Sequence, residues 1–180
     1  TLPRSKLKTH IRANAIFSAV EDMYILLRAA ANESDFRLLH DSILFAYKPC
    51  WRQGEMLDIT FDTVDLSENS LNFLDTKNGE DHEIPIHQSL VEVLKRRAHY
   101  AVDGRVFPWR NHHELRDAFY RLRDRLGISS HKVWHTVRHT VGTELVSKGA
   151  PIRVIMALLN HKKVQTTLRY AKVKANAKQE

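Results

Sequence analysis

The spacing of apolar residues divides the chain into helical segments and one β-hairpin. Ser18 and Glu21 form a capping box, which satisfies two backbone donors at a helix start. Apolar residues follow at helical spacing, so we expect a first helix that ends at about Ala31. A second helical pattern begins at Phe36 and ends near Pro49, because the residue before a proline is pushed out of the α region. Two helices therefore fill most of the stretch before residue 50.

The period of the pattern changes between residues 62 and 86. Leu71 and Phe73 alternate with polar residues, and Ile84 and Ile86 do the same beyond the turn at residues 77–80. Alternation on both sides of an Asn-Gly turn is typical of two antiparallel strands joined by a tight connection. The sequence therefore predicts a β-hairpin with Lys77 at its tip.

Helical spacing returns from Ser89 onward. We expect helices at about residues 89–101, 112–126, 134–148, 151–159 and 163–171. Gly149 is expected at the end of a helix and Pro151 at the first position of the next one. The fold class predicted from the whole pattern is mainly α with a small antiparallel β-sheet (α+β).

Composition narrows the class of protein. A chain of 180 residues with 43% apolar content is the size and make-up of one globular domain. Its formal charge of +7 would let basic side chains replace counterions along a nucleic-acid backbone. A single cysteine, Cys50, rules out an internal disulfide and fits a reducing cytosol, and no apolar run approaches the roughly 20 residues that span a bilayer. We therefore expect a soluble cytoplasmic protein.

Candidate chemistry lies in the C-terminal half of the chain. His135 and Arg138 are three residues apart on a predicted helix, so a proton-transfer group lies beside a permanent cation while Val137 faces the buried side. Further along the chain, His161 is followed nine positions later by Tyr170.

Together these motifs resemble the C-terminal half of the tyrosine recombinase (phage integrase) family. That family has His-x-x-Arg, then Leu-Gly-His about 23 residues later, then the nucleophilic tyrosine, and Arg138 and His161 are 23 positions apart here. The stretch that begins Arg52-Gln53-Gly54-Glu55 is similar to the family's first arginine motif, and Lys77 resembles its β-hairpin lysine. The resemblance covers most of the chain and implies the tyrosine recombinase catalytic-domain fold.

Four positions depart from the family pattern without removing a catalytic group. Pro49-Cys50 replaces a Thr-Gly pair, Asn160 replaces a glycine, and Thr136 replaces an acidic or similar residue. These changes lie beside Arg52 and His161, so we expect them to affect loop geometry more than the type of reaction.

The resemblance implies site-specific recombination, in which DNA is cleaved and rejoined through a 3′-phosphotyrosyl intermediate. The charge on a phosphodiester calls for forked arginine donors. A phenol with a pKa near 10 benefits from a nearby base, for which His135 is the candidate. His161 is expected to donate a hydrogen bond to the phosphate, and Lys77 is expected to give a proton to the departing 5′-hydroxyl. The candidate catalytic residues are Arg52, Lys77, His135, Arg138, His161 and Tyr170.

Partners and domain organisation also follow from the resemblance. It implies double-stranded DNA as substrate, a homotetramer on paired recombination sites, a monomer when free, and no need for a metal ion, another cofactor or ATP. We interpret residues 1–14 as a linker remnant from a missing N-terminal DNA-binding domain, residues 15–171 as the catalytic domain and residues 172–180 as a polar C-terminal tail. The expected setting is the cytoplasm of a bacterial cell, with the gene carried by a phage or mobile element.

Other interpretations of the same residues stay open. A type IB topoisomerase would share most of the candidate residues, and an integrase relic would bind DNA without cutting it. The spacing of His131, His135 and His139 could hold zinc, as could the His112-His113 pair, although no glutamate of a His-Glu-x-x-His motif accompanies them. Glu55 is expected to orient an arginine. We interpret the other tyrosines as structural: Tyr24, Tyr47, Tyr100 and Tyr120. We interpret two basic runs as charged helix faces, the first being Lys95, Arg96 and Arg97 and the second Arg116, Arg121, Arg123 and Arg125.

Overall fold

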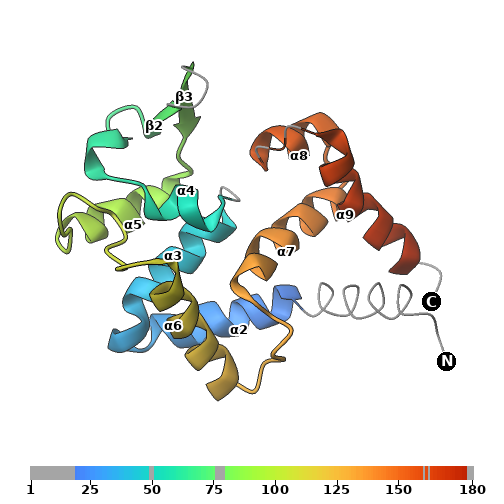
Figure 1. The fold of residues 1–180 in the computed structure, drawn as a ribbon, viewed down its shortest axis with the longest axis horizontal. Helices are drawn as coiled ribbons and strands as arrows, with labels where there is room; N and C mark the ends of the chain where they lie inside the picture. The colour runs from blue at the N-terminus through green and yellow to red at the C-terminus, as the bar shows by residue number, and fades with distance from the viewer. Residues whose placement is uncertain (1–18, 49–50, 76–79, 160, 162, 178–180) are drawn as a thin grey trace.

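The computed structural model describes residues 19–48, 51–75, 80–159, 161 and 163–177. Most of these residues are helical, and a small antiparallel sheet lies at one edge of the molecule (Figure 1). The helices are α2 (Ala19–Ala31), α3 (Arg37–Tyr47), α4 (Gln53–Leu57), α5 (Gln88–Ala98), α6 (His112–Arg125), α7 (Trp134–Ser147), α8 (Ile152–Leu158) and α9 (Val164–Ala177). The strands are β1 (Val64–Asp65), β2 (Ser70–Asp75) and β3 (Glu80–Pro85). The predicted α+β class is confirmed, and no described helix is long and apolar enough to cross a membrane.

The first two helices follow the predicted pattern and pack against each other. Their apolar faces are buried, with Met23 and Leu26 from α2 and Leu39 and Ile43 from α3. A short 3-10 turn, η1 (Ser34–Phe36), leads into α3. Ser18 and Pro49, on which the predicted ends of these helices depended, lie outside the described residues.

The predicted hairpin is present and has a third strand beside it. β2 pairs antiparallel with β3, and Leu71 lies opposite Ile84 in this register. The two-residue strand β1, which follows the 3-10 turn η2 (Phe61–Thr63), pairs with the other edge of β2. Glu80, which the sequence interpretation placed in the turn, belongs to β3 and pairs with Asp75, while the connection at residues 76–79, including Lys77, lies outside the described residues.

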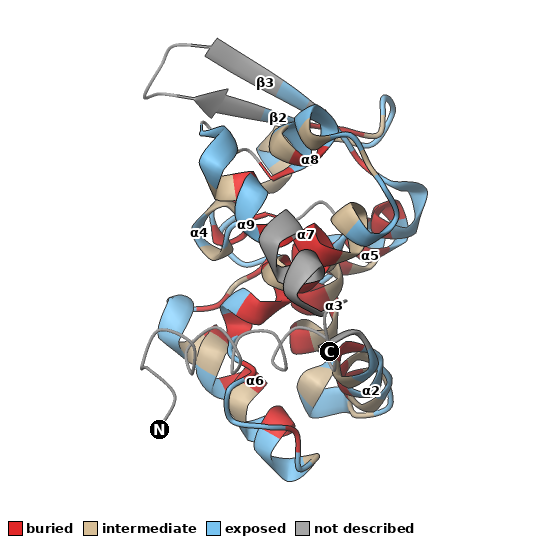
Figure 2. Ribbon diagram, turned by 90° about the vertical axis from the view of Figure 1, so that its right-hand side faces the viewer, coloured by how far each residue is buried: buried red, intermediate tan, exposed pale blue. Residues whose placement is uncertain are grey.

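Helix α7 joins two hydrophobic clusters. Its first half contributes Trp134 and Val137 to the larger cluster, which also takes apolar residues from α2, α3, α5 and α6. Its second half contributes Val141 to a smaller cluster with Ile155 of α8 and Tyr170 of α9. Figure 2 shows the buried residues concentrated along α3 and α7. The candidate nucleophile therefore belongs to a small core that α7 connects to the rest of the fold.

The ends of the later helices differ in detail from the prediction. Gly149 has a positive φ of 76° just after α7, the backbone conformation for which glycine was expected. Pro151 precedes the first residue of α8 instead of being that residue. α9 runs to Ala177, six residues beyond the predicted end, because alanine and lysine favour a helix even where no apolar face requires one.

Two arginines of the basic runs belong to the buried structure, so the prediction of a solvated helix face is wrong for them. Arg97 is 5% exposed and donates from Nε to the carbonyl of Val106 at 3.2 Å. Arg123 is 7% exposed and donates from Nη1 to the carbonyls of Ser130 and Lys132 at 3.2 and 3.0 Å. A guanidinium has five donors, so it can satisfy loop carbonyls that would otherwise be costly to bury.

A third arginine of these runs holds α5 against α3. Asp41 is fully buried, and its carboxylate accepts hydrogen bonds from Nη2 of Arg96 at 2.5 Å and from the ring of His40 at 3.1 Å. Burial disfavours the charged carboxylate, but these hydrogen bonds and charges outweigh it, so the pKa of Asp41 lies below its ordinary value. The carboxylate therefore stays ionised inside the larger core.

Candidate active site

Arg52 lies at the N-terminus of α4, a short helix that the apolar pattern did not predict. Its backbone is extended, which places it at the N-cap position. Glu55 accepts from the backbone N–H of Arg52 at 2.7 Å and from its Nη1 at 2.5 Å. The side chain of Gln53 donates to the carbonyl of His112 at 2.9 Å, which ties α4 to α6. The expected contact of Glu55 with an arginine is therefore present in the fold.

His135 and Arg138 project from the first turns of α7. The hydroxyl of Thr136 accepts from the backbone N–H of Val133 at 3.1 Å and so caps this helix start. The departure from the family pattern at Thr136 thus has a local role. His135 is exposed, whereas Arg138 is buried and donates from Nη2 to the carbonyl of Leu159 at the end of α8.

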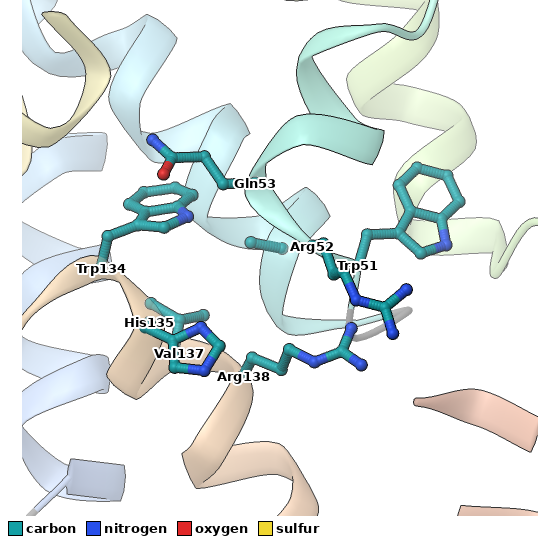
Figure 3. Close-up of a pocket in the computed structure, with 8 residues that line it drawn as sticks. Trp51, Arg52, Gln53, Trp134, His135, Val137 and Arg138 are labelled. Atoms are coloured by element: carbon teal, nitrogen blue, oxygen red, sulfur yellow. The ribbon is translucent and has the colours of Figure 1, made fainter. Parts of the chain in front are cut away.

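Arg52, His135 and Arg138 line one cavity of about 220 Å³. Figure 3 shows the two guanidinium groups turned toward the same space, with the His135 ring beside Arg138. The remaining lining residues form an apolar and amide wall: Ala46, Trp51, Gln53, Trp134 and Val137. Segments 83 residues apart in the sequence, at positions 52 and 135, therefore meet at a strongly cationic opening.

The pKa values of both candidate histidines, His135 and His161, are lowered by the charges of the same two arginines. Although His135 is exposed overall, the protein around the cavity desolvates its ring and so lowers its pKa, and the charges of Arg138 and then Arg52 lower it further. The pKa of His161 is lowered by the same causes in the same order. Both imidazoles are therefore neutral near pH 7, and among the described residues that line the cavity the two arginines supply the positive charge that would attract an anion.

His161 is positioned by the end of α8 and by α9. Its backbone N–H donates to the carbonyl of Met156 at 2.9 Å, a bond typical of a Schellman helix end. Its ring nitrogen Nδ1 lies 2.9 Å from the hydroxyl of Thr167. Its ring is parallel to that of Tyr170, with an interplanar angle of 3° and centroids 6.2 Å apart. The neighbouring Asn160 lies outside the described residues.

Tyr170 is 6% exposed and is held between other rings and the backbone of α7. The ring of His139 lies 5.7 Å from it, and His139 in turn meets His135 edge to face at 4.4 Å. The Tyr170 ring packs directly against Gly142 of α7, because a Cβ at this position would lie only 2.7 to 2.9 Å from three atoms of the ring. The four rings therefore form a series of neighbouring contacts in the order His135, His139, Tyr170 and His161.

Five of the six predicted site residues are brought into one region, and Lys77 lies outside the described residues. The sequence interpretation did not identify Gly142 or Thr167. Thr167 could have been found, because a residue three positions before Tyr170 projects from the same helix face. Gly142 could not, since the need for a missing side chain depends on a ring that another helix brings to it.

The other tyrosines lie in different surroundings. The Tyr47 hydroxyl donates to Glu144 at 2.5 Å and so links α3 to α7. Tyr120 packs under the guanidinium of Arg123 at 4.6 Å, whereas Tyr24 and Tyr100 are exposed and line no described cavity.

The histidines of the zinc alternative are dispersed by the fold. His131 lies in the turn before α7 and not on the helix face of His135 and His139. The rings of His112 and His113 lie 4.2 Å apart at an interplanar angle of 39°, at the start of α6. Within the described part of the chain, no group of three or more histidine, cysteine or acidic side chains is arranged to hold a metal ion.

Comparison with known proteins places the chain among recombinases. The sequence profile of the phage integrase family matches residues 10–177. The chain is 32% identical over 140 residues to the type 1 fimbriae regulatory protein FimE of Escherichia coli K12, with 71% of each chain covered. It is 27% identical over 173 residues to the tyrosine recombinase XerD of Halalkalibacterium halodurans, which covers 86% of this chain and 56% of that one.

Solved structures share the fold at lower identity. The crystal structure of XerA recombinase superposes with a TM-score of 0.68 at 22% identity, covering 83% of this chain and 57% of that one. XerH recombinase, bound to a palindromic difH substrate in a post-cleavage complex, gives a TM-score of 0.69 at 18% identity, covering 84% and 48%. This chain therefore spans about half the length of these solved relatives and corresponds to one part of them.

Proposed function

The chain belongs to the phage integrase family of tyrosine recombinases, and we propose that it cleaves and rejoins DNA at a specific site through a 3′-phosphotyrosyl intermediate. The observation that carries this proposal is the meeting of Arg52, His135 and Arg138 at one cationic cavity, next to the ring pair of His161 and Tyr170. Its substrate is double-stranded DNA, as the family and the DNA-bound relative suggest. The reaction takes place in the cytoplasm.

In this proposal the two arginines bind the scissile phosphate. In-line attack adds charge to the non-bridging oxygens, and fixed guanidinium donors stabilise that charge without reorganisation. The salt bridge from Glu55 holds Arg52 at the N-terminus of α4, and the bond to Leu159 holds Arg138 against α8. The two donors approach from different elements, so they can contact different oxygens of one phosphate.

In this proposal His135, Lys77 and His161 each have one role in proton transfer or hydrogen bonding. The Tyr170 hydroxyl gives its proton to neutral His135 while the new O–P bond forms, and the bond from phosphorus to the 5′-oxygen breaks. Lys77 gives a proton to the departing 5′-oxygen, and His161 donates to a non-bridging oxygen. Rejoining reverses these steps with a 5′-hydroxyl from the partner duplex. The phosphotyrosyl bond conserves the energy of the phosphodiester, so ATP is not required, and the two arginines supply the charge that a metal ion would otherwise bring to the phosphate.

The assembly we propose is a homotetramer on two paired recombination sites and a monomer in the absence of DNA. The catalytic unit in this proposal includes all of α9 to its end at Ala177, beyond residue 171 where the sequence interpretation had ended the domain. Burial of Tyr170 supports an order of events in which the nucleophile is shielded from water until DNA is bound.

A nicked suicide substrate that carries the cognate core site tests the proposal. The chain should form a covalent protein–DNA adduct that Tyr170→Phe abolishes, and Arg52→Ala or Arg138→Ala should lower its rate by about 100-fold or more. Addition of EDTA should leave the rate unchanged. Binding of the site without any adduct would support the relic alternative instead, and loss of adduct in EDTA would support a metal-dependent reaction.

A further inference from the structure

Thr167 contacts His161 from the same helix that carries Tyr170. Its side chain is fully buried, with an exposed fraction of 0%, and its hydroxyl oxygen lies 2.9 Å from Nδ1 of His161. Thr167 and Tyr170 are three residues apart on α9, so both project from one face of this helix. One helix face therefore carries the candidate nucleophile and also a hydroxyl that contacts the candidate phosphate donor.

The partner of one imidazole nitrogen decides where the ring carries its proton. A neutral imidazole has one N–H donor and one acceptor nitrogen. If the threonine hydroxyl donates to Nδ1 of His161, the ring proton lies on Nε2. A phosphate oxygen can only accept hydrogen bonds, so the Nε2–H form is the one that can contact it. The opposite tautomer would direct a lone pair at a negatively charged group.

We propose that Thr167 is a positioning residue that holds His161 in the Nε2–H tautomer and so prepares it to donate to a non-bridging oxygen of the scissile phosphate. This inference rests on the proposed function, because only phosphate chemistry requires that donor. The same contact fixes the ring orientation relative to Tyr170, to which it is parallel. A shift of α9 would therefore move the nucleophile and the donor together, so their relative register would be kept.

Two substitutions separate this role from simple packing. Thr167→Val keeps the branched shape of the buried side chain and removes the hydroxyl, whereas Thr167→Ser keeps the hydroxyl and removes a methyl group. If the residue acts by packing alone, serine should be the more harmful change. If it acts through the hydroxyl, valine should be the more harmful one and serine should restore function.

The tautomer can be measured directly on the full chain without DNA. Long-range ¹⁵N–¹H correlation spectra of protein with ¹⁵N-labelled histidine distinguish the two tautomers, and the His161 signals are those that His161→Gln removes. We expect the Nε2–H form in the unsubstituted protein and in Thr167→Ser, and a shift toward the other tautomer in Thr167→Val. An Nδ1–H form in the unsubstituted protein, or an unchanged spectrum in Thr167→Val, would overturn the inference.

Cleavage of the suicide substrate supplies the second measurement. At saturating DNA, Thr167→Val should form adduct roughly 2- to 12-fold more slowly, the effect of one lost hydrogen bond, and Thr167→Ser should stay within about twofold of the unsubstituted protein. DNA affinity, measured by fluorescence anisotropy, should not change. Slow cleavage by Thr167→Val with the Nε2–H tautomer retained would count against the inference. Failure of the unsubstituted protein to cleave would instead overturn the proposed function, while the spectra would still decide the tautomer.

Discussion

A methyl group added at Gly142 should misplace the nucleophile. In the Gly142→Ala protein the new Cβ would lie 2.7 Å from Cζ of Tyr170, 2.8 Å from Cε1 and 2.9 Å from Cε2. Ordinary van der Waals contact begins at 3.4 Å, so the ring or the helix that carries it has to move by about 0.7 Å. The ring is only 6% exposed and lies between His139 and His161, which leaves it little room to turn aside.

The displacement sets the size of the expected effect. A reacting group misplaced by about 1 Å costs roughly 100-fold in rate, so 0.7 Å should cost about 10- to 100-fold. Overpacking costs about 1–3 kcal/mol of stability, but alanine is favoured over glycine in a helix by about 1 kcal/mol. The free energy of unfolding should therefore fall by no more than about 2 kcal/mol, so the loss of cleavage should far exceed any loss of folded protein.

Single-turnover adduct formation on the suicide substrate measures the rate, and urea unfolding measures the stability. Gly54→Ala serves as the stability control, because a Cβ at Gly54 in α4 would contact nothing within 4 Å. Its free energy of unfolding should be unchanged or raised. An adduct rate for Gly142→Ala within about threefold of the unsubstituted protein would refute the reasoning, since it would show that the Tyr170 ring does not depend on the missing side chain.

Three further predictions concern the pH profile and the links between helices. The lowered pKa of His135 keeps it a neutral base at pH 7, so adduct formation at subsaturating DNA should be lost only as the pH falls below 6.5; a midpoint above that value would contradict the assignment. Asp41→Asn should lower the free energy of unfolding, measured in urea, by about 3 kcal/mol. This is the low end of the range for breaking a buried ion pair, because Arg96 stays partly exposed. A decrease of less than about 1 kcal/mol would contradict a stabilising role for this ion pair. Because the folded-state pKa of Asp41 is lowered, this contribution should be complete above about pH 4 and lost as the pH falls through that lowered value. Tyr47→Phe should lower the free energy of unfolding by about 1 kcal/mol through loss of the bond to Glu144, and Glu144→Gln, which keeps an acceptor, should cost less.

The helices could be predicted because their apolar faces repeat within a few residues along the chain. In α3 the buried apolar residues Leu39, Ile43 and Ala46 lie four and then three positions apart, so the pattern is local. The five-residue helix α4 is too short to show this repeat, although its N-cap residue, Arg52, lines the cavity of the candidate site. The buried Arg97 and Arg123 were read as solvated, because the carbonyls that they bind come from loops that no local pattern predicts.

By itself, the sequence determined the family, the fold class and the identity of the candidate catalytic groups, because each depends on residue types at set distances along the chain. Only the tertiary structure decided how those groups meet. Gly142 lies under Tyr170 and Thr167 contacts His161 because α7, α8 and α9 pack around one small core. The cavity between Arg52 and Arg138 likewise exists only where α4 and α7 come together. Contacts between distant segments depend on the packing of whole helix faces, which the spacing of residues along the chain does not contain.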